Sequence, residues 1–200
     1  CNFPLMSEFS GEILPPADRE PKLAYVGGIT MNRGISEVLS ALGALGDVRL
    51  NLAGRFMNSE IEKMITSMPE WSKVDYVGQV GRQEVRSILS HSCAGLVTLH
   101  GIPNYKDSLP IKLFEYMAAG LPFIASDFPY WMELLQEDDC GVFVDPNSPV
   151  EIKNAARKLI DNPDRSQTMG ENGRRAFLKK YNWDIEEQKL LQLYEELLNE

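Results

Sequence analysis

Two carboxylates frame a short stretch whose residue types could bind a ligand with both phosphate and hydroxyl groups. Asp107 and Glu115 lie in the run from Gly101 to Pro122, and Pro110 between them marks the first turn of a predicted helix, where its missing N–H is tolerated. Free backbone N–H groups and the dipole at such a helix N-terminus favour an anion such as phosphate. The carboxylates would instead accept hydrogen bonds from hydroxyls. The pattern therefore predicts a nucleotide-sugar site.

The elements around this stretch alternate between short apolar runs and helical patterns. Most of the runs lack a period of two, as expected for strands of a parallel sheet covered on both faces. We expect six strands, at 23–26, 48–53, 74–77, 94–99, 123–125 and 142–144. Helical spacing predicts helices at 35–45, 60–68, 83–89, about 110–119, 130–135, 149–160, 165–180 and 183–198. Right-handed crossovers then give a doubly wound α/β domain, with a mostly parallel Rossmann-like sheet and additional C-terminal helices.

This topology places the candidate site at the edge of the sheet where such folds bind ligands. The stretch that holds Asp107 and Glu115 follows the fourth predicted strand, and ligands bind at the carboxyl ends of the strands in doubly wound sheets. Residues 1–21 are rich in Pro, Ser and Glu without a clear period, so we expect a linker or entry segment there. Residues 22–200 are expected to form one domain.

The last predicted helix carries an apolar stripe that has to be covered. The stripe comprises Leu190, Leu191, Tyr194, Leu197 and Leu198. We expect the helix to bury this stripe in its own domain. A domain outside the sequence is the alternative.

Composition narrows the class of protein. The net charge of −9 argues against a nucleic-acid surface, and no run approaches the ~18 apolar residues of a membrane span. The first residues lack the pattern of a signal peptide, and the absence of an initiator Met suggests a piece of a longer chain. Cys1, Cys93 and Cys140 form no CxxC pair, which favours reduced thiols and a cytoplasmic protein. Without a DxD motif or a His/Cys cluster, no metal ion or other cofactor is expected.

Four segments in the right order resemble one enzyme family. They are YVGGITMNRGISEVLSAL, VDYVGQVGRQEVRSILSHSCAGLVTL, DSLPIKLFEYMAAGLPFIASD with its E-x7-E-like spacing, and CGVFVDPNSPVEIKNAARKLIDNPD. They resemble the C-terminal, donor-binding domain of family 4 glycosyltransferases of the GT-B type. The resemblance covers roughly residues 22–200. It implies a UDP- or GDP-sugar donor and a metal-independent transfer with retention of configuration. The sugar, polysaccharide or lipid-linked acceptor would be held through a missing N-terminal domain, in a full-length enzyme compatible with a peripheral position at a membrane.

The resemblance also assigns roles on the central stretch. Glu115 corresponds to the family's ribose-binding carboxylate. Asp107 stands where the family usually has Glu, which contacts the transferred sugar, and is one methylene shorter. Backbone N–H groups of Ser108 and Leu109 would meet the diphosphate, whereas Pro110 cannot donate.

The glycine-rich loop departs further from the family pattern. Many members carry an Arg directly after the Gly of the strand and a Lys five residues later, both on the diphosphate; here these places hold Gly28 and Arg33. Gly28, with Gly27 before it, would let the backbone approach the ligand, and Arg33 can still bind phosphate bidentately. Lys112 is a candidate for the compensating charge. Gln79 lies where the family reads the base.

Each assignment has a structural alternative. Glu115 and Lys112 are spaced as a surface ion pair on a helix, Asp107 could be a turn residue, the glycines could end a strand, and Arg33 could be solvated. His91 and His100 are expected to be structural, with His100 retained as a site candidate, and the three Trp residues to pack in the core.

Two other functions stay open at this point. A nucleotide-sugar epimerase shares the two-domain architecture. A non-catalytic nucleotide-binding domain would explain the departures at Gly28 and Asp107.

Overall fold

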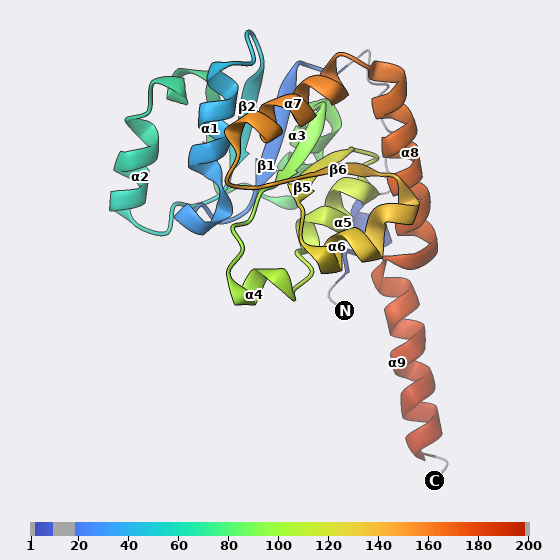
Figure 1. Cartoon of the computed structure of the whole chain (residues 1–200). Helices are drawn as coiled ribbons and strands as arrows, with labels where there is room; N and C mark the ends of the chain where they lie inside the picture. The colour runs from blue at the N-terminus through green and yellow to red at the C-terminus, as the bar shows by residue number, and fades with distance from the viewer. Residues whose placement is uncertain (1–2, 10–18, 199–200) are drawn as a thin grey trace.

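The computed structural model describes residues 3–9 and 19–198, and these form the expected six-stranded parallel sheet (Figure 1). The strands are β1 (Lys22–Val26), β2 (Arg49–Ala53), β3 (Val74–Gly78), β4 (Ala94–Val97), β5 (Phe123–Ser126) and β6 (Gly141–Val144). Their order in the sheet is β3-β2-β1-β4-β5-β6, and every neighbouring pair is parallel. The doubly wound, Rossmann-like α/β prediction is confirmed.

Helices cover both faces of the sheet, as the apolar strands require. They are α1 (Ile35–Gly43), α2 (Ser59–Thr66), α3 (Arg82–His91), α4 (Pro103–Lys106), α5 (Ile111–Ala118), α6 (Pro129–Leu135), α7 (Pro149–Ile160), α8 (Pro163–Lys180) and α9 (Trp183–Leu198). Single 3-10 turns lie at η1 (Met6–Phe9), η3 (Met31–Arg33), η4 (Pro69–Lys73) and η5 (Gln136–Asp138). Buried residues of α1 and α7 lie in one core cluster and those of α3, α5 and α6 in the other, while α8 contributes Met169 to the first cluster and Ala176 and Phe177 to the second.

The fourth strand ends two residues earlier than predicted. β4 ends at Val97, its last residue paired with β5, and the chain then turns toward the loop that follows β1. There the backbone N–H of His100 donates to the carbonyl oxygen of Asn32 at 2.9 Å. The short helix α4 follows, which the sequence analysis did not predict, and Pro103 occupies its first turn.

The described part of the N-terminal segment packs on the domain. Phe3 and Phe9 are buried in the cluster of α3 and α5, and the ring of Phe3 lies 4.6 Å from that of Phe114, centroid to centroid. The backbone N–H of Trp183, at the start of α9, donates to the carbonyl oxygen of Pro4. A link from residues 1–21 to another domain stays a prediction; residues 1–2 and 10–18 lie outside the described part.

The prediction that α9 buries its apolar stripe in its own domain is wrong. α9 has no buried residue, and its leucines face outward, with Leu191 56% and Leu198 84% exposed. Figure 1 shows α9 extending away from the domain beyond α8. Periodicity identified the apolar face but not what covers it. Within the described residues, no helix is long and apolar enough to cross a membrane.

Candidate functional site

The loops after β1 and β2 meet backbone to backbone at the carboxyl edge of the sheet. Gly27 and Gly54 have φ values of 136° and 145°, in a region that side chains disfavour. A Cβ atom on Gly54 would overlap the carbonyl oxygen of Gly27. The N–H of Gly27 donates to Ala53 O at 2.9 Å, and that of Gly54 to Gly78 O at 2.7 Å. The glycines therefore let the strand ends pack closely beside an open pocket.

That pocket, about 310 Å³ in volume, brings together three of the residues selected from the sequence. Gly27, Gly28 and Gln79 line it, together with Gly54 and Arg55. A Cβ atom on Gly28 would meet no atom within 4 Å, so the space beside this residue is free for a ligand. The Gly28 carbonyl oxygen accepts a 2.8 Å hydrogen bond from the Tyr25 hydroxyl, which fixes the loop.

Two cations converge on Gly27 from different elements. A Cβ atom built on Gly27 would lie 3.2 Å from Nζ of Lys112 on α5 and 3.4 Å from Nη1 of Arg33 at the end of η3. Lys112 is only 6% exposed, and its Nζ has no hydrogen-bond partner among the described residues; nor has Nε of Arg33. Lys112 Nζ lies 3.8 Å from the ring centroid of Tyr25. Buried polar groups are normally satisfied, so this arrangement indicates a site for an anion.

Burial and neighbouring charges shift the pKa values of Lys112, Tyr25 and Arg33. Burial and the nearby Arg33 together lower the pKa of Lys112 to about 7, and Glu115 partly opposes this shift. Burial raises the pKa of Tyr25 to about 12, against the effect of Arg33. Burial lowers the pKa of Arg33, but Tyr25 and Tyr105 outweigh it and the net shift is upward. An anion beside Lys112 would favour its charged form.

Glu115 is buried, and its partner is not the one that helical spacing suggested. Its carboxylate accepts a 2.5 Å hydrogen bond at Oε1 from Nη1 of Arg82, the first residue of α3. Glu115 is 4% exposed, and Lys112 is buried as well. The alternative of a surface ion pair between Lys112 and Glu115 is therefore wrong.

Asp107 and Ser108 lie apart from these contacts. Asp107 caps the C-terminus of α4 and is exposed; its backbone N–H donates to Tyr105 O, but its side chain makes no hydrogen bond or ion pair within the described residues. The N–H of Ser108 donates to Tyr105 O at 3.4 Å, and Ser108 O accepts a 2.6 Å hydrogen bond from Trp131 Nε1. Leu109 is half-buried against the cluster of α3 and α5. Contact of these residues with a ligand stays a prediction.

The two histidines lie close to other residues of the domain, although the buried Nε2 of His100 has no hydrogen-bond partner within the described residues. His91 Nδ1 lies 2.8 Å from Ser87 O in the last turn of α3, and His100 Nε2 lies 3.3 Å from Glu37 Oε2. Trp131 is fully buried, in agreement with a packing role. In the part of the chain that the structure describes, no group of three or more His, Cys, Asp or Glu side chains could hold a metal ion.

Sequence reasoning missed the residues that hold the site residues in place. Tyr25 faces Lys112, Tyr105 interacts with Arg33, and Arg82 binds Glu115. In the sequence, Tyr25 has the pattern of an ordinary strand residue, and Arg82 that of a polar residue at the start of a helix. The one available signal was position, because both lie near the carboxyl ends of strands.

The sheet order and the helices on both faces define a Rossmann-like α/β domain, and known proteins share this fold. An alpha-D-kanosaminyltransferase of Streptomyces kanamyceticus is 25% identical over 185 residues, covering 90% of this chain and 47% of that protein. An Anabaena protein, HepE, solved in complex with UDP, has a TM-score of 0.82 at 15% identity, over 98% of this chain and 56% of that chain. The C-terminal domain of a glycosyl transferase group 1 family protein, LpcC of Francisella tularensis, has a TM-score of 0.72 at 18% identity, over 89% and 98%.

The fold is thus that of the C-terminal half of a GT-B glycosyltransferase. The profile of the family described as glycosyl transferases group 1 matches residues 7–176, and the chain belongs to this family. The chain spans about half the length of the curated relatives it matches.

Proposed function

We propose that this domain binds the nucleotide-diphosphate sugar donor of a retaining, metal-independent glycosyltransferase that transfers a sugar to a hydroxyl acceptor. The observation that carries the proposal is the convergence of Lys112 and Arg33 on Gly27, with buried nitrogen atoms that lack partners in the described residues. A diphosphate would satisfy both cations. Family membership and the UDP bound to HepE support a nucleotide as the anion.

The geometry supports a division of roles along the donor. The base would lie in the 310 Å³ pocket beside Gln79, and the diphosphate between Arg33 and Lys112. Glu115, one helical turn after Lys112, would accept hydrogen bonds from the ribose hydroxyls. Asp107, exposed on the neighbouring loop, would contact the sugar that is transferred.

The proposed chemistry is the electrostatic stabilisation of a leaving group. When the bond between the anomeric carbon and the diphosphate oxygen breaks, the electron pair leaves with the nucleoside diphosphate. Preorganised cations stabilise such developing charge without reorganising. Arg33 and Lys112 would supply the positive charge that a bound metal ion supplies in other transferases, so EDTA is expected to leave UDP affinity unchanged.

Calorimetric titration of the chain with UDP, GDP and ADP tests the proposal. We expect one of these nucleotides to bind with a micromolar to millimolar Kd, and Lys112→Met to weaken this binding. Lys63→Met, which removes an exposed lysine on α2, is the matched control and should bind as the wild type does. If none of the three nucleotides binds at millimolar concentration, the proposal is refuted.

Turnover requires a separate assay, because the acceptor is expected to bind to a second domain outside this sequence. The isolated chain should bind donor without appreciable transfer, and the full-length protein should transfer sugar.

A non-catalytic nucleotide-binding protein is the second candidate, and one observation favours it. Gly28 offers no cation, and the side chain of Asp107 has no partner within the described residues that would fix its orientation. Nucleotide binding by the full-length protein with neither sugar transfer nor hydrolysis would support this candidate. An epimerised nucleotide sugar as the product would instead indicate an epimerase.

A further inference from the structure

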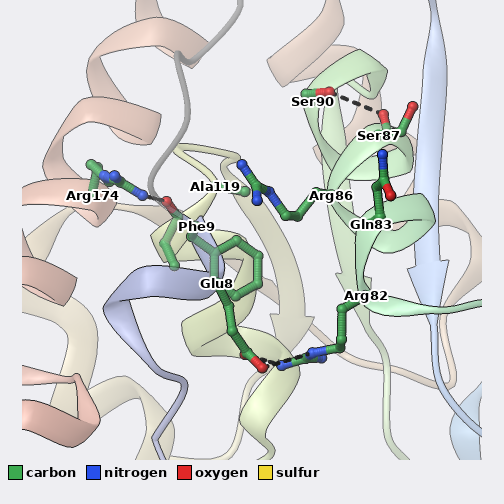
Figure 2. Close-up of a pocket in the computed structure, with 10 residues that line it drawn as sticks. Glu8, Phe9, Arg82, Gln83, Arg86, Ser87, Ser90, Ala119 and Arg174 are labelled. Atoms are coloured by element: carbon green, nitrogen blue, oxygen red, sulfur yellow. Dashed lines mark hydrogen bonds and ion pairs between the residues drawn. The ribbon is translucent and has the colours of Figure 1, made fainter.

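Glu115 is the buried end of a chain of three charges that begins at the surface. Arg82 donates from Nη1 to Oε1 of Glu115, and from Nε and Nη2 to both carboxylate oxygens of Glu8 on η1. The Arg82 side chain is 50% exposed, that of Glu8 27% and that of Glu115 only 6%. Figure 2 shows Arg82 and Glu8 pointing toward one another from α3 and the N-terminal segment. One guanidinium therefore bridges a buried and an exposed carboxylate.

The buried carboxylate depends on this guanidinium. A buried charge without a partner is unfavourable, and a hydrogen bond to a charged group is stronger and more directional than a neutral one. The charged or titratable groups that face Glu115 are Arg82 from α3 and, on its own helix, Lys112 and Tyr116. Burial lowers the pKa of Lys112 to about 7, so Arg82 is the constant cation. It occupies Oε1, and Oε2 makes no hydrogen bond within the described residues.

The exposed end of the bridge is fixed by the packing of η1. Glu8 lies next to Phe9, a residue that is 5% exposed and packs in the cluster of α3 and α5. The Glu8 carboxylate raises the pKa of Arg82, and Glu115 adds to this against the effect of burial. Glu8 and Arg82 both line a cavity of about 490 Å³. The contact between the N-terminal segment and Arg82 therefore lies at the surface of the domain.

We propose that Arg82 is a positioning residue for the donor: it orients Glu115 toward the ribose, and Glu8 couples the docking of the N-terminal segment to that orientation. The inference rests on the proposed function, because it assumes that Glu115 binds the nucleotide. The fixed Oε1 leaves Oε2 to accept from a ribose hydroxyl. Release of residues 6–9 from the domain would remove Glu8 from Arg82 and weaken donor binding from outside the pocket.

The experiment measures UDP affinity of the 200-residue chain and its variants by calorimetry. Loss of one charged hydrogen bond predicts that Arg82→Gln weakens binding about tenfold. Arg82→Lys, which keeps the charge, should restore part of the affinity. Arg86→Gln is the matched control: Arg86 lies one turn later on the same helix and lines the same cavity, but its side chain makes no hydrogen bond or ion pair within the described residues (Figure 2). It should bind UDP as the wild type does.

Two double-mutant cycles separate positioning from a general structural effect. If Arg82 acts through Glu115, Arg82→Gln should cause no further loss in a Glu115→Gln background. Glu8→Gln should weaken binding by about threefold, as expected for a half-exposed pair, and this effect should vanish in the Arg82→Gln background. Should Arg82→Gln fail to fold, Arg82→Lys replaces it in both cycles.

Three results would overturn the inference. Arg82→Gln could bind UDP like the wild type although Glu115→Gln is weakened, or it could lose the same factor with and without Glu115. The effect of Glu8→Gln could also persist unchanged without Arg82. A wild-type chain that binds no nucleotide would refute the proposed function as well, so the two failures are distinguishable.

Discussion

Raising the pH above 7 is expected to weaken UDP binding, because the diphosphate would contact a lysine that loses its proton in this range. Burial and the proximity of Arg33 lower the pKa of Lys112 to about 7 in the free protein. A bound diphosphate favours the charged ammonium and raises the pKa again. Binding is then linked to the uptake of a proton, and its affinity has to fall as the pH rises through the pKa of the free protein.

The size of the effect follows from the linkage between proton and ligand. Each pH unit above the free pKa costs about 1.4 kcal/mol for charging Lys112, which is about tenfold in Kd. Between pH 7.5 and 9 the affinity should therefore decrease by up to about thirtyfold. The slope decreases once the pH approaches the pKa of Lys112 in the complex. The second ionisation of a phosphate lies near 6, so UDP itself stays fully charged over this range.

Calorimetry in buffers of different ionisation enthalpy measures the proton uptake directly. At pH 8 we expect close to one proton taken up per UDP bound. Lys112→Met should bind more weakly at pH 7.5 and show neither the uptake nor the slope. Lys63→Met, which removes a lysine of α2 outside the pocket, should retain both.

A wild-type UDP affinity that does not change between pH 7.5 and 9 would refute this reasoning. So would a Lys112→Met variant with the wild-type slope, because another group would then be the one that titrates.

Three further predictions concern single residues. Glu115→Gln should reduce UDP affinity by about 1–3 kcal/mol in calorimetry, since a buried charged acceptor is lost; equal affinity in a folded variant would contradict its role on ribose. Gly54→Ala should lower the free energy of unfolding by about 2 kcal/mol or more in urea titrations, because φ is 145° and the Cβ meets Gly27 O; a variant as stable as the wild type would show that the loop relaxes. Asp107→Asn should leave UDP affinity unchanged but lower the rate of sugar transfer by the full-length protein, and an unaltered rate would exclude contact with the sugar.

The fold was predictable because its central strands β1, β2, β4 and β5 are largely buried. Such strands are short apolar runs, and their alternation with helices leaves few topologies. The end of β4 was not predictable in the same way. Thr98 and Leu99 are residue types that favour a strand. The chain nevertheless turns after Val97, and the N–H of His100 donates to Asn32 O. The two residues are 68 positions apart, so a local sequence pattern cannot predict this contact.

The sequence predicted the candidate ligand-binding residues better than it predicted the residues that hold them in place. Glu115 and Lys112 lie one turn apart, a spacing that fits an exposed ion pair as well as two buried charges with different partners. Only tertiary structure distinguishes these, since Arg82 reaches Glu115 over 33 positions and Glu8 over 74. Family resemblance pointed to Glu115 and Arg33, and the structure added Tyr25 as the ring beneath Lys112.

The unburied helix α9 should behave as a separate unit in hydrogen exchange. It has 16 residues and no buried side chain, a length at which an isolated helix is only marginally stable in water. Its amide protons beyond the first turn should therefore exchange through local helix–coil opening, far faster than those of the core strands, which require larger unfolding events. Any surface that covers its leucines would slow this exchange, so the amides of α9 would report the arrival of a partner.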